Sequence, residues 1–91
     1  MPISMLREPR VLESTGDKRS NFRKKVAEGR YTPPVKIGAR AAAWPSDEVE
    51  ALARARVAGL DETQIRALVR RLLAKRKAVA AELREQLAQG E

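Results

Sequence analysis

The stretch NFRKKVAEGRYTPPVKIGARAAAW, residues 21–44, contains every aromatic residue of the chain together with six basic residues and one acid. Its first part has helical spacing, because Phe22 and Val26 stand four residues apart and share one side of a helix. Pro33 and Pro34 then exclude a continuing helix. The order predicted for this stretch is a short basic helix followed by extended chain.

The extended part of the stretch has the pattern of a small β-hairpin. Val35 and Ile37 alternate with Lys36, as residues of a half-buried strand do. Gly38-Ala39 can form a two-residue turn that begins with glycine, and Lys36 and Arg40 flank its tip. The register is open at this point, since a three-residue loop would rotate Arg40 onto the other face of the hairpin.

Two helices joined by a tight turn are predicted on the N-terminal side. Residues 1–6 are expected to be a loose lead-in, and EPRVLESTG forms a short helix with Pro9 in its first turn and Gly16 at its end. Asp17 is the expected N-cap of the next helix, which ends at Gly29. The two helices and their turn form a helix-turn-helix pattern.

Two further helices are predicted on the C-terminal side of the hairpin. The first is expected to run from a cap at Ser46 or Asp47 to Gly59. The second begins with the pattern of a capping box, in which Asp61 caps the helix and Gln64 reaches back to the cap.

The last helix is predicted to run to about Ala88, a length of roughly 40 Å at 1.5 Å per residue. One arc of this helix is apolar, but Arg76 falls in the middle of the arc and divides it into two stripes. The second stripe, Val79 to Leu87, could fold back on the domain, pair with a neighbouring protomer, or dock on an integrase or RNA polymerase. The apolar residues of the whole arc are Ile65, Leu68, Val69, Leu72, Leu73, Val79, Leu83 and Leu87.

The residue types that the chain lacks exclude several classes of function. Without Cys, it can form neither a disulfide nor a thiolate zinc site. Without His, it lacks the commonest general base and the commonest imidazole metal ligand. We therefore expect that the protein is not an enzyme and has no catalytic residues, no metal site and no cofactor.

The net charge of +7 predicts an anionic partner. Residues 1–40 hold ten basic and four acidic residues, whereas residues 41–91 hold nine and eight, so nearly all the excess lies in the first part. No apolar run has the length of a signal peptide or a membrane span. A cytoplasmic location without membrane contact is therefore expected.

The predicted elements combine into a mostly α fold with a small β-hairpin. We expect a winged helix-turn-helix domain over residues 1–58 and a long C-terminal helical extension over residues 59–91. In this layout the second helix enters the major groove of double-stranded DNA, and the hairpin tip approaches an adjacent groove or the phosphate backbone. Basic and small polar side chains of these two elements are the candidate DNA-binding residues: Lys18, Arg19, Ser20, Asn21, Arg23, Lys24, Arg30, Lys36 and Arg40.

The three aromatic residues are expected to form a core. In a short domain a few large apolar side chains provide most of the buried area, so Phe22, Tyr31 and Trp44 should hold the basic helix against the hairpin. The alternative, stacking on single-stranded bases, would require the rings to be exposed on one surface.

Several short motifs are spaced along the N-terminal part of the chain: Thr15-Gly16, Arg19-Ser20, Glu28-Gly29-Arg30, Pro34-Val35-Lys36-Ile37-Gly38, Arg40, Ala43-Trp44 and Ser46 to Glu50. Together they resemble the AlpA-type, excisionase-like family of small prophage and mobile-element regulators, which is similar to MerR-type winged helices. The chain departs from the family pattern at Asp17-Lys18 and at Phe22 to Lys25, where the family usually has Leu-Ser and Leu-Tyr-Arg-Leu. Lys25 replaces an apolar residue, and the departures raise the positive charge.

The resemblance implies sequence-selective binding to duplex DNA. The protein would act in transcription control or in the excision of an integrated element. In excision, such proteins bend DNA and steer an integrase. The implied partners are double-stranded DNA, an integrase or RNA polymerase, and further copies of the chain side by side along DNA. Excision and transcription control use the same DNA-binding domain, so the sequence leaves both roles open.

Two other classes of function are also open. One is a helical protein–protein interaction module, such as an adaptor or an antitoxin-like protein, that acts through the C-terminal helix. The other is an RNA-binding protein, which would use the same positive charge.

Overall fold

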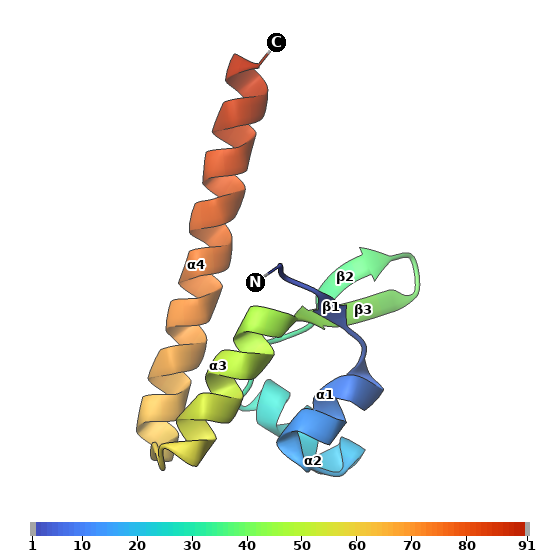
Figure 1. The fold of residues 1–91 in the computed structure, drawn as a ribbon, viewed down its shortest axis with the longest axis vertical. Helices are drawn as coiled ribbons and strands as arrows, with labels where there is room; N and C mark the ends of the chain where they lie inside the picture. Colours follow the sequence, from blue (N-terminus) through green and yellow to red (C-terminus); the bar gives the residue numbers. More distant parts are fainter. Residues whose placement is uncertain (1, 91) are drawn as a thin grey trace.

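A three-stranded antiparallel sheet and four helices make up the chain in the computed structural model, which describes residues 2–90 (Figure 1). The elements in chain order are β1 (Met5–Leu6), α1 (Glu8–Thr15), α2 (Arg19–Ala27), β2 (Val35–Gly38), β3 (Ala41–Pro45), α3 (Ser46–Val57) and α4 (Glu62–Gln89). The prediction of a mostly α, winged helix-turn-helix fold followed by a long C-terminal helix is confirmed.

The sheet has the order β1-β3-β2, so β3 is its central strand. Leu6 pairs with Trp44. The backbone N–H of Ser4 donates to Ser46 Oγ at 2.8 Å, and the N–H of Ser46 donates to Ser4 O at 2.8 Å. The prediction of a loose lead-in is therefore wrong for residues 4–6, because the second edge of β3 pairs with them.

Two predicted helix caps are also wrong. Pro45 occupies the N-cap position of α3, since the Ser46 hydroxyl accepts a bond from the N-terminal segment instead. Lys18 occupies the N-cap position of α2, and the Asp17 carboxylate pairs with the ammonium of Lys25 at 2.7 Å. The Ser46 hydroxyl thus bonds to the N-terminal segment, and the Asp17 carboxylate bonds to a side chain within α2 rather than to a backbone N–H of its first turn.

The hairpin turn lies one residue later than predicted. Gly38 is opposite Ala41, so the turn consists of Ala39 and Arg40 rather than Gly38 and Ala39. The pairing shifts between Lys36 and Gly38, as in a β-bulge. A glycine suits such an irregular position in a strand.

The aromatic residues lie in the core, as predicted. Phe22 has no exposed surface, and its ring meets Tyr31 and Trp44 edge to face, with centroid distances of 4.9 and 5.2 Å. The indole N–H of Trp44 donates to Thr32 O at 2.7 Å. These contacts join α2 to the hairpin.

The helix α4 contributes to the same core through its first half. Its predicted capping box is present, and Ile65 and Val69 are buried among the residues of α1 to α3. The division of the chain between residues 58 and 59 stays a prediction, but the core is continuous across it. Beyond this contact α4 projects past the other elements, and Leu83 and Leu87 are 52% and 73% exposed (Figure 1).

Arg76 marks the change between the two parts of α4. Its Nε and one terminal nitrogen donate to the two carboxylate oxygens of Glu48 at 2.6 Å each, and the same terminal nitrogen donates to Pro33 O at 2.9 Å. Glu48 is only 4% exposed. The cation that interrupts the apolar stripe in the sequence thus neutralises a buried carboxylate on α3.

Across residues 2–90, no helix combines the length and the apolar composition of a membrane span. The same part of the chain holds no group of three or more acidic side chains that could bind a metal ion.

Candidate nucleic-acid interface

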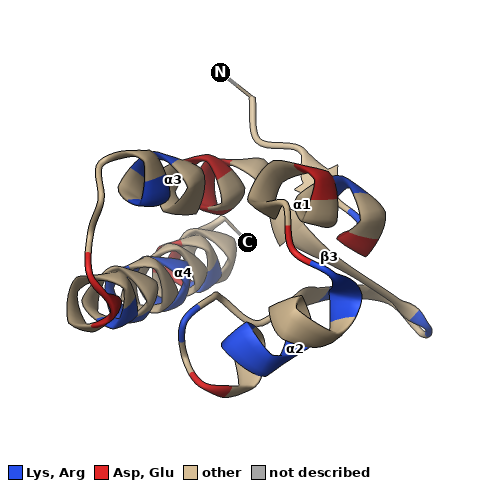
Figure 2. Ribbon diagram, turned by 90° about the horizontal axis from the view of Figure 1, so that it is seen from below, with Lys and Arg blue, Asp and Glu red and all other residues tan. Residues whose placement is uncertain are grey.

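The helix α2 and the hairpin border one hollow in the surface. This hollow has a volume of about 480 Å³ and is lined by Arg23 from α2, Arg40 from the hairpin turn and Arg7 from the segment before α1. Phe22 and Trp44 form part of its apolar lining. The structure therefore brings side chains of the two predicted DNA-binding elements to the same hollow. Figure 2 shows Lys and Arg residues, in blue, along α2.

The solvent side of α2 carries short polar and long basic side chains. Ser20, Asn21 and Lys24 are exposed, and so is Lys18 at the N-cap position. Phe22 lies on the opposite side and anchors the helix in the core. Gly16 adopts a left-handed conformation with φ of 74°, which turns the chain sharply from α1 into α2.

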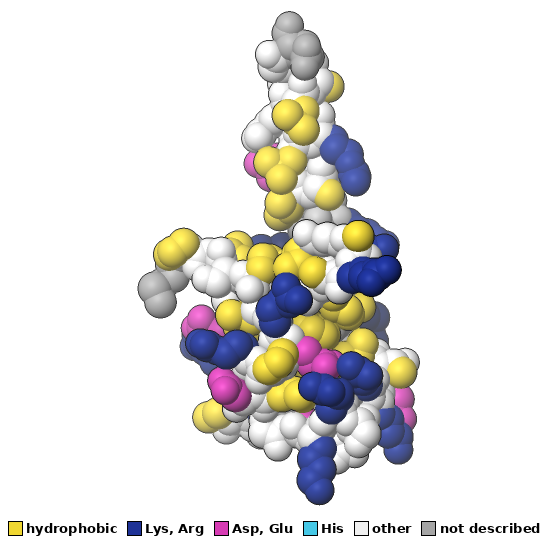
Figure 3. All heavy atoms as spheres, turned by 90° about the vertical axis from the view of Figure 1, so that its right-hand side faces the viewer, with side chains coloured by type: hydrophobic (Ala, Val, Ile, Leu, Met, Phe, Trp, Pro, Cys, Tyr) yellow, Lys and Arg dark blue, Asp and Glu magenta, His cyan; other side chains and the backbone are white. Residues whose placement is uncertain are grey.

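The hairpin presents two further candidates. Lys36 lies in β2 opposite Ala42, and Arg40 lies in the turn; both are exposed. Viewed from the side of the hairpin, Figure 3 shows Lys and Arg side chains distributed over the surface with acidic side chains among them. The face is therefore basic but not uniformly so.

Glu8, at the start of α1, pairs with two of the candidate residues. Arg23 donates to both carboxylate oxygens of Glu8 at 3.1 Å, and Arg19 Nε lies 3.1 Å from Glu8 Oε1. The hydrogen bond from Arg23 and the charges of both arginines lower the pKa of the Glu8 carboxyl, although burial opposes them. The pKa of Arg23 is raised by the same hydrogen bond. Glu8 thus neutralises part of the positive charge of α2 and orients two arginines.

Arg23 and Arg40 are the two candidate residues that line the hollow, whereas Arg30 lines a different cavity. Its guanidinium donates to Glu28 and to Glu62, which joins the end of α2 to the start of α4. Only 18% of its side chain is exposed. Its role in DNA binding stays a prediction, but its observed contacts are within the protein.

Arg7 is a lining residue that the sequence analysis missed. It lies between the predicted lead-in, residues 1–6, and the predicted helix that begins at Glu8, and nothing local in the sequence relates it to the hairpin. The pairing of β1 with β3 places it there, because this pairing fixes the N-terminal segment beside the hairpin.

A comparison with protein families matches this part of the chain. The family described as "Prophage CP4-57 regulatory protein (AlpA)" matches residues 4–57, which extend from the segment leading into β1 to the end of α3 and form more than half of the chain. Neither a search of curated proteins nor a search of solved structures gave a match. The whole of α4 and the loop before it lie outside the matched range. The fold, the spaced motifs and the extent of this match together show that the chain belongs to the AlpA family of prophage regulatory proteins.

Proposed function

We propose that the protein is a sequence-selective binder of duplex DNA that acts in a mobile genetic element as an excisionase or as a transcriptional regulator. One observation carries this proposal: Arg23 of α2 and Arg40 of the hairpin turn line a single hollow. Membership of a prophage regulatory family supports the same conclusion. An integrase or RNA polymerase would be the protein partner in the two roles.

The dimensions of α2 suit the major groove. An α-helix with its side chains is about 10–12 Å across, and the major groove is about 12 Å wide. The nine residues of α2 provide about 13 Å of helix to lie in it. With Phe22 turned into the core, Ser20 and Asn21 face outward, where they can reach base edges. Lys18 and Lys24 would contact phosphates on either side of the groove.

The hairpin would contact the backbone beside the groove that α2 enters. Arg40 at its turn and Lys36 in β2 would neutralise phosphates and release counterions, which supplies a large part of the affinity. The hollow between α2 and the hairpin would receive the intervening sugar-phosphate strand. In this mechanism the protein binds and shapes DNA, and any cleavage or joining of strands belongs to the integrase.

Lys24→Ala and Arg40→Ala should each weaken binding to a duplex carrying the element's attachment or promoter region about five- to tenfold at low salt. Each substitution should also lower the slope of log affinity against log salt by about 1, because one phosphate contact is lost. Fluorescence anisotropy between about 50 and 200 mM salt measures both quantities. Arg54→Ala, an exposed charge on α3, is the matched control. Wild-type affinity in both variants, or a wild-type affinity that hardly changes with salt, would contradict the proposal.

Glu8→Gln should strengthen DNA binding by roughly threefold to tenfold at low salt and steepen the salt dependence. The neutral amide no longer competes with phosphates for Arg19 and Arg23, so both guanidinium groups become available to the DNA. The same anisotropy titration measures the effect, and Glu13→Gln, an exposed acid further along α1, is the control. Weaker binding by the Glu8 variant would show that the carboxylate mainly positions the two arginines.

Excision and transcription control are distinguished by where the protein binds. Footprinting over the attachment site and over the promoter of the element would separate the two roles. Protection of the attachment site, together with a bend in the bound DNA, supports the excisionase role.

A second candidate function, contact with another protein through the distal part of α4, is favoured by the exposure of Val79, Leu83 and Leu87. Charges of both signs border these residues, so a second copy of the helix could match them. A chain that ends at Lys77 keeps Ile65 and Val69 in the core, whereas deletion of residues 61–91 would remove both.

The full chain should therefore associate with rising concentration in sedimentation experiments, while the chain that ends at Lys77 stays monomeric and keeps its affinity for DNA. Val57→Gln, which alters an exposed apolar residue outside α4, should leave association unchanged. Identical sedimentation of the full and shortened chains would contradict self-association through this stripe.

A further inference from the structure

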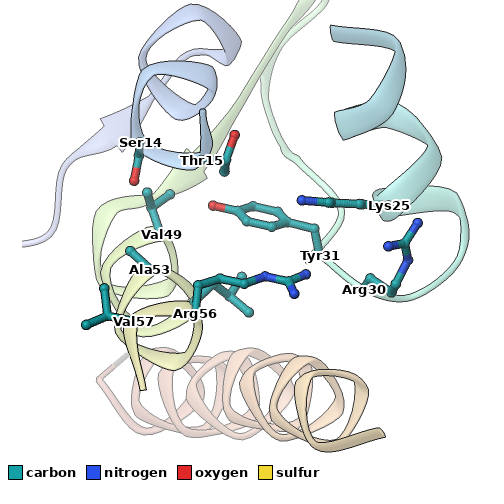
Figure 4. Close-up of a pocket in the computed structure, with 10 residues that line it drawn as sticks. Ser14, Thr15, Lys25, Arg30, Tyr31, Val49, Ala53, Arg56 and Val57 are labelled. Carbon is teal, nitrogen blue, oxygen red and sulfur yellow. The ribbon is translucent and has the colours of Figure 1, made fainter. Parts of the chain in front are cut away.

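A second cavity lies on the other side of α2 from its exposed face, between α1, α3 and the end of α2 (Figure 4). Its volume is about 270 Å³, close to the lower end, roughly 300 Å³, of small-molecule sites. Val49, Leu52 and Ala53 form an apolar wall on the side of α3. The cavity is separate from the hollow that borders the hairpin, since the two share no lining residue.

Tyr31 is one of the residues that line this cavity, and it carries an unused hydrogen-bonding group. The residue is only 5% exposed, and its hydroxyl has no hydrogen-bond partner in the part of the chain that the structure describes. Leaving such a buried group unpaired costs about 1–3 kcal/mol. Burial raises the pKa of the Tyr31 phenol, and the charges of Glu48 and Asp17 raise it further, so the hydroxyl keeps its proton at neutral pH. It is therefore a donor without an acceptor.

The charged residues that line the cavity are all cations. Lys25, Arg30 and Arg56 contribute to the lining, and no acidic residue does. Figure 4 shows Lys25 and Arg56 extending toward the Tyr31 ring from α2 and α3. Lys25 gives one of its three N–H donors to Asp17, and Arg30 is bonded to two carboxylates. Arg56 forms no ion pair with any residue from 2 to 90.

We propose that this cavity binds a small organic anion, with its carboxylate or phosphate held by Tyr31, Lys25 and Arg56 and its apolar body against α3. The head group would accept a hydrogen bond from the buried phenol and charge-assisted bonds from the two cations. Val49 and Leu52 would cover the apolar part of the ligand. The bound molecule would touch α1, α2 and α3 at once.

Titration of ¹⁵N-labelled protein with benzoate and with phenyl phosphate, at constant ionic strength and without DNA, tests this proposal. At least one of the two anions should produce saturable chemical-shift changes, confined to backbone amides around the cavity. Uncharged benzyl alcohol should produce no such changes. Arg56→Gln should weaken that binding about tenfold or more, and Tyr31→Phe about fivefold, since each removes a bond to the anion. Arg54→Gln, two residues away on an exposed face, should bind like the wild type.

The proposal would be overturned by the absence of saturable shifts with both anions, by equal binding of benzyl alcohol, or by unchanged affinity in Arg56→Gln. Unchanged affinity in Tyr31→Phe would also overturn it, because water alone would then satisfy the phenol. The titration contains no DNA, so its outcome is independent of the DNA-binding proposal.

Discussion

Arg76→Ala should lower the free energy of unfolding by about 3–5 kcal/mol, the usual cost of removing one partner of a buried ion pair. Arg76 supplies the cation bonded to the Glu48 carboxylate, and Glu48 is 4% exposed. The substitution leaves that carboxylate buried without its partner and also removes the donor to Pro33 O. The melting temperature should fall by at least ~12 °C, since about 4 °C or more is lost per kcal/mol in a domain of this size.

Two further variants isolate the cause of this loss. Lys77→Ala removes the neighbouring exposed charge of α4 and should change the free energy of unfolding by less than about 0.5 kcal/mol. The double variant Glu48→Leu/Arg76→Leu should be more stable than Arg76→Ala, because neither charge is then buried. Thermal unfolding followed by circular dichroism measures all three. A melting temperature of Arg76→Ala within a few degrees of the wild type would show that α4 is not held through this pair.

Phe22→Ala should be comparably destabilising, by about 3–5 kcal/mol. The ring has no exposed surface and lies between Tyr31 and Trp44, so its removal leaves a cavity between α2 and the hairpin. DNA binding should fall with the folded population, because α2 loses its anchor in the core. Urea unfolding measures the loss through the fluorescence of Trp44, the one tryptophan of the chain.

Phe22→Leu keeps much of the buried volume and should cost less than about 1.5 kcal/mol. Ser20→Ala, on the exposed side of the same helix, should change stability by less than about 0.5 kcal/mol and serves as the control. If Phe22→Ala unfolded at the urea concentration of the wild type, the aromatic cluster could not be what joins α2 to the hairpin.

Local signals in the sequence predicted most of the fold. Gly16 and Gly29 end their helices with positive φ, and Asp61 and Gln64 form the capping box. Arg76 divides the apolar stripe of α4 where the helix leaves the core. Each of these signals lies within a few residues of the feature it determines, so no knowledge of the tertiary structure was needed.

The features that the sequence did not predict depend on residues far apart in the chain. The strand β1 has only two residues, and its pairing with β3 has no local pattern. Ser46 was expected to cap α3 because nothing nearby showed that Ser4 would bond to its hydroxyl. In the candidate interface, the pairing of Glu8 with Arg23 follows from the packing of α1 against α2, which the spacing of single residues does not reveal.

The position of the N-terminal segment at the sheet edge also affects how the protein can be labelled. An affinity tag or fluorophore attached ahead of Ser4 would lie beside the central strand, and close to Arg7. Such an attachment would risk blocking a bound nucleic acid. The far end of α4 projects away from both hollows, so a dye placed near Ala88 could report tumbling or surface immobilisation without obstructing either one (Figure 1).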